Sequence, residues 1–520
     1  MKSILKSTFW QLAVVYSVFV ILISVNLFWK YTLHFEIFAV LLGIIGWFLI
    51  ENGEKENKME FNKYLHYSLF VLAIVLIFVF RFVPYASNQI PLGYDAGIYK
   101  YGIENFFENG FGMDKWVKGA LEPGFLYFMF VMKLFFSTDF ILTWLLILFS
   151  IFLGISVYFF AKEYFNKGTG IIALLIYSVS AIQFKVFELM YYKNIIALSL
   201  LLWSLWFLKR NNRLMFISFA VLVGIFHRPT FFIFGLSYII FVLCRVIFVK
   251  KEDGKNRWIK EIIDGLIILD LSLVFYIGFI EEAILPLIYP VAASFISPGN
   301  SSGTFVSFFS YQFSTLAYLP LSIVGFLYLL KKKEFNMLFF WTVINVLIVY
   351  FQFFFFNRFI IHLDIALIIL AGKGFSLTIE KKRIVGYTVL TLLLFSTFFV
   401  GLQEVRNAGP LISEYDLDLI REFRNVEKDA SVMSISSEYS PGVLAYSGRK
   451  TIAPGLFDEN VWSETEWQRF WNSKDKTEIM SLLSVYERPI YLFAGTKKFS
   501  NPCFKIYSEK NGGKIYKYEC

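Results

Sequence analysis

The sequence predicts a mainly α-helical membrane protein, a polytopic transmembrane bundle of about thirteen spans followed by a small extracytoplasmic α/β domain. Of its 520 residues, 57% are hydrophobic and 20% aromatic, and only 17% are charged, which is more apolar surface than a soluble domain of this size buries. The apolar residues form runs long enough to cross a bilayer. From about residue 402 the composition changes to mixed polar sequence. We therefore expect a transmembrane domain at 1–402 and an extracytoplasmic domain at 403–520.

The first apolar run lies in "MKSILKSTFWQLAVVYSVFVILISVNLFW". Its charged start is typical of a signal peptide, but the run is about twenty residues long and lacks a small-residue cleavage site. We therefore expect a retained first helix. The predicted spans are 8–28, 35–50, 65–85, 139–160, 169–185, 194–208, 214–227, 230–249, 261–280, 311–330, 335–356, 358–376 and 384–402.

Short Lys/Arg clusters determine the predicted topology, because cytoplasmic loops carry an excess of these residues. The net charge is +9, but the clusters are dispersed between spans, so no nucleic-acid partner is predicted. The run 124–136 is shorter than the roughly 17–25 residues that a span needs, and counting it as a span would move later clusters outside. We therefore place it along the outer interface of a multi-pass plasma-membrane protein with a cytoplasmic N-terminus. The inner clusters are 51–63, 161–168, 209–213, 250–260, 331–334 and 380–383.

In the C-terminal domain, "SEYDLDLIREFRNVEKDA" predicts a helix, "SVMSISS" and "RPIYLFAG" predict strands, and "SSEYSPGVLAYSGRKTIAPG" is typical of a turn-rich loop. Asn511-Gly512 predicts a two-residue hairpin turn, which places Cys503 opposite Cys520. Opposed strand residues lie within disulfide range, and an extracytoplasmic location lets the bond persist. We predict a Cys503–Cys520 disulfide; the alternative is two unpaired thiols near a frayed terminus. Cys244 is interpreted as a small apolar residue.

Asp95 stands in the predicted outer catalytic loop, 86–138. The stretch "DAGIYKYGIENFFENG" predicts an amphipathic helix that Gly110 closes. One interpretation makes Asp95 the N-cap of this helix, since a carboxylate there accepts backbone N–H groups and interacts favourably with the helix dipole. The other makes it a general base just above the bilayer, or a group that orients a nucleophile. The two interpretations are compatible.

Other ionisable residues lie near the same outer level, and such groups are costly near a membrane unless they are paired or functional. They are Glu122, Lys185, Glu188, Lys193, His227, Arg228, Arg358, His362 and Asp364. Arg358 suits a lipid-linked phosphate, because a guanidinium makes bidentate contacts with one, and Lys193, Arg228 and His227 are further candidates. Snorkelling to headgroups would equally explain Lys185 and Lys193. Internal polar contacts would explain His362 and Asp364.

Two motifs follow one another in the outer loop, "YDAGIYKYGIENFFENG" and "LEPGFLYF". Their layout resembles the glycosyltransferase-C superfamily, polytopic enzymes that use polyprenyl-phosphate-linked sugars, and in particular its protein O-mannosyltransferase and aminoarabinose transferase type. Those families carry an acidic residue leading a helix with a spaced Tyr and Gly, then a Pro-containing aromatic motif on an interfacial segment. The resemblance implies that Asp95 is the catalytic base and that Tyr99, Glu122 and Pro123 support the loop or the acceptor.

Weaker similarities to the same families are "YYKN" at 191–194, "HRP" at 227–229 and Arg358. The sequence also departs from their pattern, since Ala96 rather than Glu follows the acidic residue and "EP" replaces Lys-Pro-Pro. The C-terminal domain has no "WWDYG"-like motif. We therefore expect the catalytic subunit of oligosaccharyltransferase to be a poor match despite its similar layout.

The resemblance implies transfer of one hexosyl or pentosyl group from a polyprenyl-phosphate-linked donor to a glycan, protein or lipid acceptor on the outer face. Asp95 would take the proton of the acceptor hydroxyl as it attacks the anomeric carbon with inversion. Cationic side chains, Arg358 foremost, would stabilise the leaving phosphate, and apolar spans would hold the prenyl tail. No cofactor is required, although a divalent metal is not excluded. The alternatives are a transporter or flippase for a lipid-linked glycan and a glycan ligase or polymerase.

Overall fold

The computed structural model describes residues 2–24, 29–52, 62–86, 89–248, 251–285, 305–353, 356–453 and 461–520. These residues divide into two compact units. The first unit comprises Met1–Pro84, Glu122–Phe125 and Leu146–Ala408, and the second comprises Tyr85–Leu121, Leu126–Leu145 and Gly409–Cys520. Most of the predicted outer loop therefore groups with the C-terminal residues rather than with the membrane helices.

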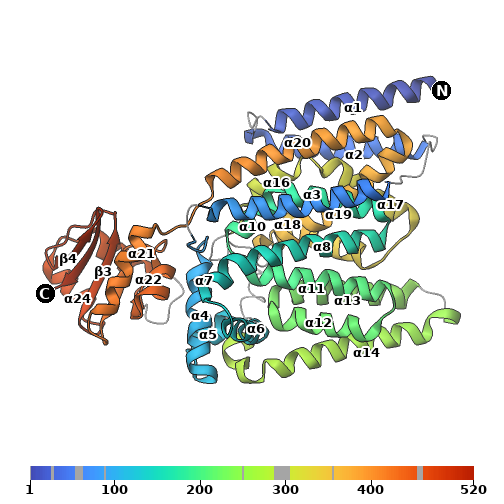
Figure 1. The fold of residues 1–520 in the computed structure, drawn as a ribbon. Helices are drawn as coiled ribbons and strands as arrows, with labels where there is room; N and C mark the ends of the chain where they lie inside the picture. Colours follow the sequence, from blue (N-terminus) through green and yellow to red (C-terminus); the bar gives the residue numbers. More distant parts are fainter. Residues whose placement is uncertain are drawn as a thin grey trace. The chain divides into compact units, whose positions relative to one another are not determined.

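The first unit is a helical bundle whose long helices run roughly parallel to one another (Figure 1). Its helices are α1 (Lys2–Ser24), α2 (Thr32–Asn52), α3 (Lys63–Phe82), α8 (Leu146–Tyr164), α9 (Lys167–Val179), α10 (Ala181–Glu188), α11 (Tyr192–Lys209), α12 (Arg213–Phe226), α13 (Arg228–Phe248), α14 (Lys251–Phe275), α16 (Phe308–Thr315), α17 (Leu319–Lys332), α18 (Met337–Tyr350), α19 (Phe356–Lys381) and α20 (Arg383–Asn407). Helix α19 is the most enclosed of the candidate spans, with 94% of its apolar window buried. Gly325 lets α17 pack closely on it, since a Cβ at this position would lie 2.1 Å from the carbonyl oxygen of Leu370.

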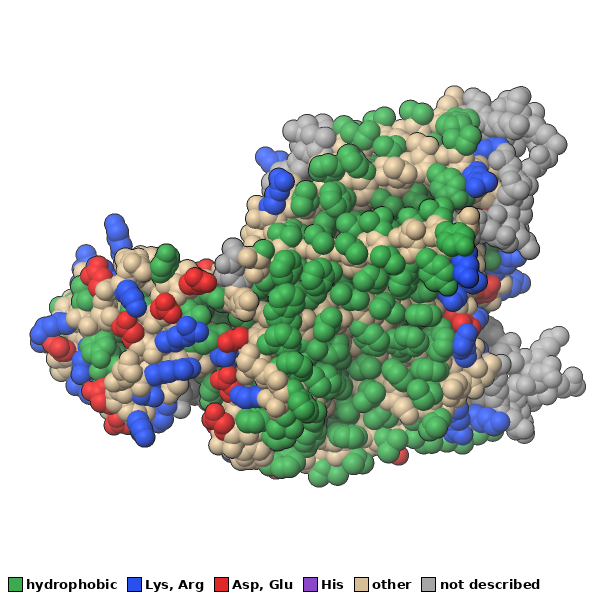
Figure 2. All heavy atoms as spheres, viewed as in Figure 1, with side chains coloured by type: hydrophobic (Ala, Val, Ile, Leu, Met, Phe, Trp, Pro, Cys, Tyr) green, Lys and Arg blue, Asp and Glu red, His purple; other side chains and the backbone are tan. Residues whose placement is uncertain are grey.

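Each predicted span overlaps a helix or a bent helix pair of this unit. By length and composition, six helices among the described residues can cross a membrane, or up to nine if each bent pair is one span, and three shorter apolar helices accompany them. The predicted count of thirteen is not confirmed by this measure. Figure 2 shows apolar side chains covering most of the visible face of the bundle, with Lys and Arg gathered along one end, as expected for a protein surface in contact with lipid.

Ion pairs connect basic clusters that the topology predicts on the same side. Lys331 pairs with Glu51, and Arg210 pairs with Glu163 at 3.0 Å. These contacts join helix ends that are distant in sequence at one end of the bundle. The shared end agrees with the predicted grouping of the clusters, while its identity as the cytoplasmic end stays a prediction.

Two helix breaks in the bundle meet at one carboxylate. Helices α9 and α10 bend by 53° at Ser180, and α16 and α17 bend by 80° around Tyr318. Asp364 of α19 accepts hydrogen bonds from Ser180 at 3.4 Å, from Gln183 at 2.6 Å and from the Tyr318 hydroxyl. The predicted internal polar contact of Asp364 is therefore confirmed, and the interaction stabilises both breaks, where helix backbone groups lose their regular partners.

The second unit combines short helices of the outer loop with a C-terminal α/β domain. Its helices are α4 (Asp95–Asn109), α5 (Lys115–Ala120), most of α6 (Pro123–Lys133), α7 (Thr138–Phe140), α21 (Glu414–Arg421), α22 (Ser440–Ser447), α23 (Glu464–Asn472) and α24 (Lys476–Leu483). Its strands are β1 (Ser431–Ser434), β2 (Lys450–Ile452), β3 (Ile490–Gly495), β4 (Phe504–Lys510) and β5 (Gly513–Tyr518), in the order β2-β1-β3-β5-β4. Strands β1, β2 and β3 are parallel, and β5 is antiparallel to both β3 and β4.

Most predicted elements of this domain are confirmed, but the expected loop at "SSEYSPGVLAYSGRKTIAPG" is wrong. Within this stretch, Ser440–Ser447 form α22 and Lys450–Ile452 form β2, and its last two residues lie outside the described part of the chain. Pro441 lies in the first turn of the helix, where a missing N–H costs nothing, and Gly448 ends it with φ of 65°. Residues that favour turns thus mark the ends of a helix here, and every residue of α22 is buried.

The hairpin of β4 and β5 turns at Asn511 and Gly512, both with positive φ, as predicted. A β-bulge between Ile506 and Ser508 then shifts the register by one residue. Cys503 consequently lies opposite Glu519, and the N–H of Glu519 donates to the carbonyl oxygen of Cys503. The predicted direct opposition of Cys503 to Cys520 is therefore wrong. The two cysteines still form a disulfide, with their Cα atoms 5.1 Å apart.

We predict that the disulfide leaves one reactive thiol in the unfolded protein. The chain has three cysteines, and Cys244 is the free one in the structure. Denatured protein without reductant should therefore bind one equivalent of a thiol reagent, and reduced protein should bind three. A Cys244→Ser variant is the control and should bind none before reduction. Three reactive thiols without reductant would contradict the pairing.

Candidate active site

Asp95 is the first residue of α4 in the second unit, and it is partly exposed. The interpretation of Asp95 as the N-cap is wrong, because Tyr94 occupies that position and makes no side-chain capping bond. A carboxylate at the first helical position still interacts favourably with the helix dipole. Tyr99 lies one turn further along α4 and is buried, consistent with support of the helix rather than contact with solvent.

The start of α4 is held closely by α22. A Cβ at Gly97 would lie 2.1 Å from the carbonyl oxygen of Pro441, so only glycine permits this approach. Burial and the neighbouring negative charge of Asp95 raise the pKa of Tyr94 to about 12, which keeps the phenol neutral at physiological pH. Further along the helix, Lys100 pairs with Asp139 at 3.1 Å. Local sequence patterns give no sign of the contacts of Gly97 with Pro441 and of Lys100 with Asp139, because they join segments far apart in the chain.

A cluster of ionisable side chains surrounds Glu122 in the first unit. Glu122 is 1% exposed. One of its carboxylate oxygens lies 2.6 Å from Nζ of Lys193. The other accepts the backbone N–H of Arg228 at 3.4 Å and its Nε–H at 3.2 Å. The structure therefore joins three of the residues that the sequence analysis proposed for the site.

The cluster holds Glu122 ionised. Burial alone would raise the pKa of its carboxyl group, but the charges of Lys193, Arg228 and His227, together with the hydrogen bond from Lys193, bring the pKa well below its usual range. Lys193 itself is buried, so it does not snorkel to headgroups. Lys185 is more exposed and pairs with Glu188 at 2.7 Å; for this residue snorkelling stays an alternative.

The cations of the cluster stand at helix N-termini. Lys193 is the second residue of α11, Arg228 the first of α13 and Arg358 the third of α19. The partial positive charge of a helix N-terminus disfavours cations. Local helix energetics therefore do not explain these residues, and a negative charge nearby is needed to stabilise them; Glu122 provides one for Lys193 and Arg228.

Arg358 and His227 complete the cluster. Arg358 is half-buried; in the described part of the chain its guanidinium stacks 5.4 Å over the ring of Phe305 and forms no ion pair with a carboxylate. It lies close enough to Lys193 and His227 to interact with both electrostatically. The cluster thus contains three basic side chains, those of Lys193, Arg228 and Arg358, against the single carboxylate of Glu122, which suits a phosphate group.

An apolar cavity of about 340 Å³ lies between α12, α13 and α14, and Arg228 is the charged residue in its lining. The lining residues on α13 run from Arg228 to Ile239, which is about 16 Å along a helix. A Cβ at Gly235 would meet no atom within 4 Å, so this glycine leaves the cavity open. A hydrophobic chain with an anionic end group matches these surroundings.

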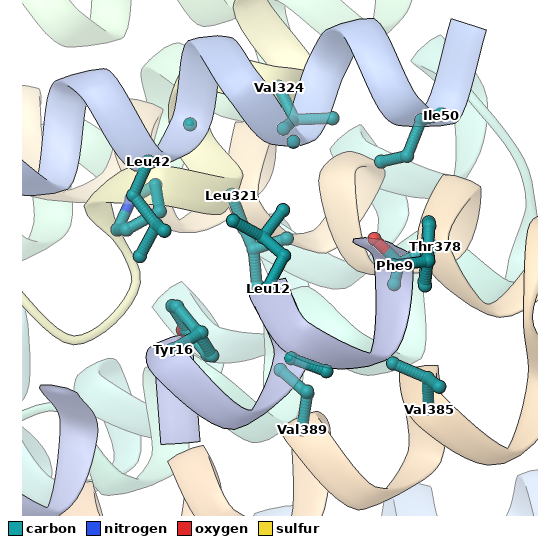
Figure 3. A pocket seen from close by; sticks show the side chains of 14 residues that line it. Phe9, Leu12, Tyr16, Leu42, Ile50, Leu321, Val324, Thr378, Val385 and Val389 are labelled. Atoms are coloured by element: carbon teal, nitrogen blue, oxygen red, sulfur yellow. The ribbon is translucent and has the colours of Figure 1, made fainter. Parts of the chain in front are cut away.

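A second pocket, of about 60 Å³, lies between α1, α2, α17, α19 and α20 (Figure 3). Its lining is apolar apart from Tyr16 and Thr378 and contains no charged group, so it offers nothing to bind a phosphate. For metals, no group of three His, Cys, Asp or Glu side chains lies together within the described ranges.

The family model described as dolichyl-phosphate-mannose-protein mannosyltransferase matches residues 123–274. This segment includes Lys193, His227 and Arg228. A comparison with curated protein sequences found no match.

The fold is similar to those of solved membrane glycosyltransferases. The oligosaccharyltransferase AglB from Archaeoglobus fulgidus, in complex with an inhibitory peptide and a dolichol-phosphate, matches with a TM-score of 0.60 and 13% identity over 84% of this chain and 70% of AglB. ArnT from Cupriavidus metallidurans, bound to undecaprenyl phosphate, matches with a TM-score of 0.57 and 11% identity over 88% of this chain and 97% of ArnT. The expected resemblance is therefore confirmed for the fold and by the family model over residues 123–274. The similar layout expected of oligosaccharyltransferase is confirmed for the fold, and the distinction based on the missing "WWDYG"-like motif stays a prediction.

We predict that Glu122→Gln destabilises the protein. Removing the carboxylate leaves Lys193 and Arg228 uncompensated in a buried site, a loss of about 3 kcal/mol in the free energy of unfolding. The matched control is Glu163→Gln. The partner of Glu163, Arg210, is half-exposed, so loss of this ion pair should lower the free energy of unfolding by at most about 1 kcal/mol. Unfolding in detergent, followed by temperature or denaturant, measures both.

The stability difference between the wild type and Glu122→Gln should depend on pH with a defined sign. Because the pKa of Glu122 is lower in the folded state, its contribution to stability is complete above its ordinary pKa of about 4.5 and is lost as the pH falls below that value. The stability difference between wild type and Glu122→Gln should therefore shrink below about pH 5. A constant difference from pH 7 to pH 4 would contradict the assignment.

Proposed function

We propose that the chain is a membrane glycosyltransferase that moves one sugar from a polyprenyl-phosphate-linked donor to an acceptor on the outer face, with inversion at the anomeric carbon. The observation that carries the proposal is the cationic cluster around Glu122 at one end of an apolar cavity. The bound lipid phosphates of AglB and ArnT, which share the fold, support this donor class.

In the proposed reaction the acceptor oxygen attacks the anomeric carbon of the donor as the bond to the phosphate oxygen breaks. The carboxylate of Asp95 receives the hydroxyl proton, and its partial exposure on the first turn of α4 leaves it accessible to a substrate. The polyprenyl phosphate leaves with the bonding electrons, and its growing negative charge requires fixed positive partners. Arg358, Lys193 and Arg228 supply those charges.

The role of Glu122 differs from that of the cations. Its negative charge keeps Lys193 and Arg228 in place before the donor binds, so the site does not have to reorganise during the reaction. Helix α6, which begins at Pro123 directly after it, fixes the position of the carboxylate. Support of the loop by Glu122 and Pro123 is then support of the phosphate site.

The alternative of a lipid-linked glycan transporter has one observation in its favour. Three helix pairs are bent by 53°, 58° and 80°, and broken helices with a polar side chain at the break are common in transporters. Proteoliposomes loaded with a fluorescent lipid-linked sugar distinguish the two. A transporter moves the lipid between leaflets without an acceptor, whereas a transferase leaves its distribution unchanged and consumes it when an acceptor is present.

We predict that Asp95→Asn lowers the rate of sugar transfer about 10²- to 10⁴-fold, because the variant cannot accept the hydroxyl proton. Purified protein with a set of radiolabelled polyprenyl-phosphate sugars measures the rate. Glu108→Gln, an exposed acidic residue of the same helix, is the matched control and should transfer at the wild-type rate. Transfer by Asp95→Asn at the wild-type rate with every active donor would show that Asp95 is not the base.

We also predict that Arg358→Ala weakens use of the lipid donor about 10- to 100-fold, the loss expected for hydrogen bonds to a charged group. Because Arg358 has no carboxylate partner among the described residues, its removal strands no opposite charge and should change stability little. The matched control is Arg383→Ala, since Arg383 also stacks over an aromatic ring, that of Tyr387. Equal donor dependence in both variants would count against a phosphate role for Arg358.

A further inference from the structure

Three buried side chains form a hydrogen-bonded row beside the cationic cluster. Nδ1 of His227 lies 2.8 Å from the hydroxyl of Thr230, and the same hydroxyl lies 3.1 Å from Nε2 of His362. Each of the three residues has a relative exposure of 0%. The predicted internal contact of His362 is thereby confirmed, and α13 and α19 are joined by a polar contact that the sequence does not reveal.

The geometry determines where the protons lie. The backbone N–H of Thr230 donates to Nδ1 of His227 at 3.3 Å, so this nitrogen carries a lone pair and no proton. The Thr230 hydroxyl must then donate its single hydrogen to Nδ1 and accept from the Nε2–H of His362. In the neutral imidazole of His227 the proton therefore resides on Nε2.

Nε2 of His227 is buried and has no hydrogen-bond partner in the described part of the chain. Buried donors in proteins are nearly always paired, so an unpaired one calls for a bound group. The charged groups that act on this imidazole are Glu122, Lys193 and Arg358, the members of the proposed phosphate site. A neutral donor is well suited to that place, because it adds a hydrogen bond without adding a charge that the neighbouring cations would repel.

We propose that Nε2–H of His227 donates a hydrogen bond to a phosphate oxygen of the lipid donor, and that Thr230 and His362 are positioning residues that hold His227 in the required tautomer. The inference rests on the proposed function and deepens it, since it assigns one donor atom and two residues that touch no substrate. Thr230 belongs to α13, which begins at Arg228, and His362 belongs to α19, whose third residue is Arg358.

The tautomer can be measured without any lipid. The chain has four histidines, so solid-state ¹⁵N spectra of histidine-labelled protein contain few signals, and His227→Gln identifies those of His227. We expect a protonated Nε2 and an unprotonated Nδ1 for His227. Protonation on Nδ1 would overturn the proposal.

Binding of two lipids then tests the contact itself. We expect undecaprenyl phosphate, but not undecaprenol, to shift the Nε2 signal of His227. Thr230→Val should reduce affinity for undecaprenyl phosphate about tenfold, while Thr230→Ser, which keeps the hydroxyl, should restore it. Thr397→Val is the matched control, because its buried hydroxyl donates, among the described residues, to carbonyl oxygens of its own helix. It should bind as the wild type does.

The outcomes separate the two proposals. If wild type and Thr230→Val bind undecaprenyl phosphate equally well, the positioning role is wrong and the proposed function stands. If the wild type does not bind undecaprenyl phosphate more tightly than undecaprenol, both are wrong. If Thr230→Ser binds as weakly as Thr230→Val, the loss reflects packing rather than the hydroxyl, which also overturns the positioning role.

Discussion

The buried ion pairs of Glu122 with Lys193 and Arg228 are the interaction on which the proposed site depends. Two cations at helix N-termini oppose the helix dipole and would repel each other in a buried setting. A single carboxylate that contacts both makes the arrangement stable and leaves a net positive charge. That residual charge distinguishes the cluster from the balanced pairs at the other end of the bundle, such as Arg210 with Glu163, which neutralise themselves and have nothing left for a ligand.

The membrane unit supports this cluster through buried polar contacts between helices. Asp364 bonds residues at two helix breaks, and Thr230 connects His227 with His362. In an apolar environment, polar groups must find hydrogen-bond partners within the protein. Separating these helices would leave such groups without partners, which costs free energy, so the contacts hold the helices together. The apolar cavity beside Arg228 then adds a binding surface for a hydrophobic chain. A charged end group and an apolar tail are the two features of a lipid-linked donor.

The second unit places Asp95 by packing rather than by charge. Gly97 allows the backbone of α4 to approach Pro441 closely, and Pro441 belongs to a helix that the sequence analysis expected to be a loop. The acidic residue and the C-terminal domain are therefore parts of one compact unit. This gives the C-terminal domain a definite structural role, since the position of α4 depends on it whether or not it also contacts the acceptor.

The sequence by itself determined the helical membrane class, the change of composition near residue 402, the helix after Asp95 and the hairpin turn at Asn511-Gly512, because each depends on apolar periodicity or on local backbone preference. It also identified Lys193, His227, Arg228 and Arg358 as costly residues near a membrane. Only the tertiary structure showed that Glu122 joins two of them, that the Thr230 hydroxyl lies between His227 and His362 and that a bulge shifts Cys503 by one position. The contacts of Glu122 and Thr230 join residues up to 132 positions apart, and the position of Cys503 depends on an irregular strand. Local sequence patterns predict neither long-range contacts nor a β-bulge.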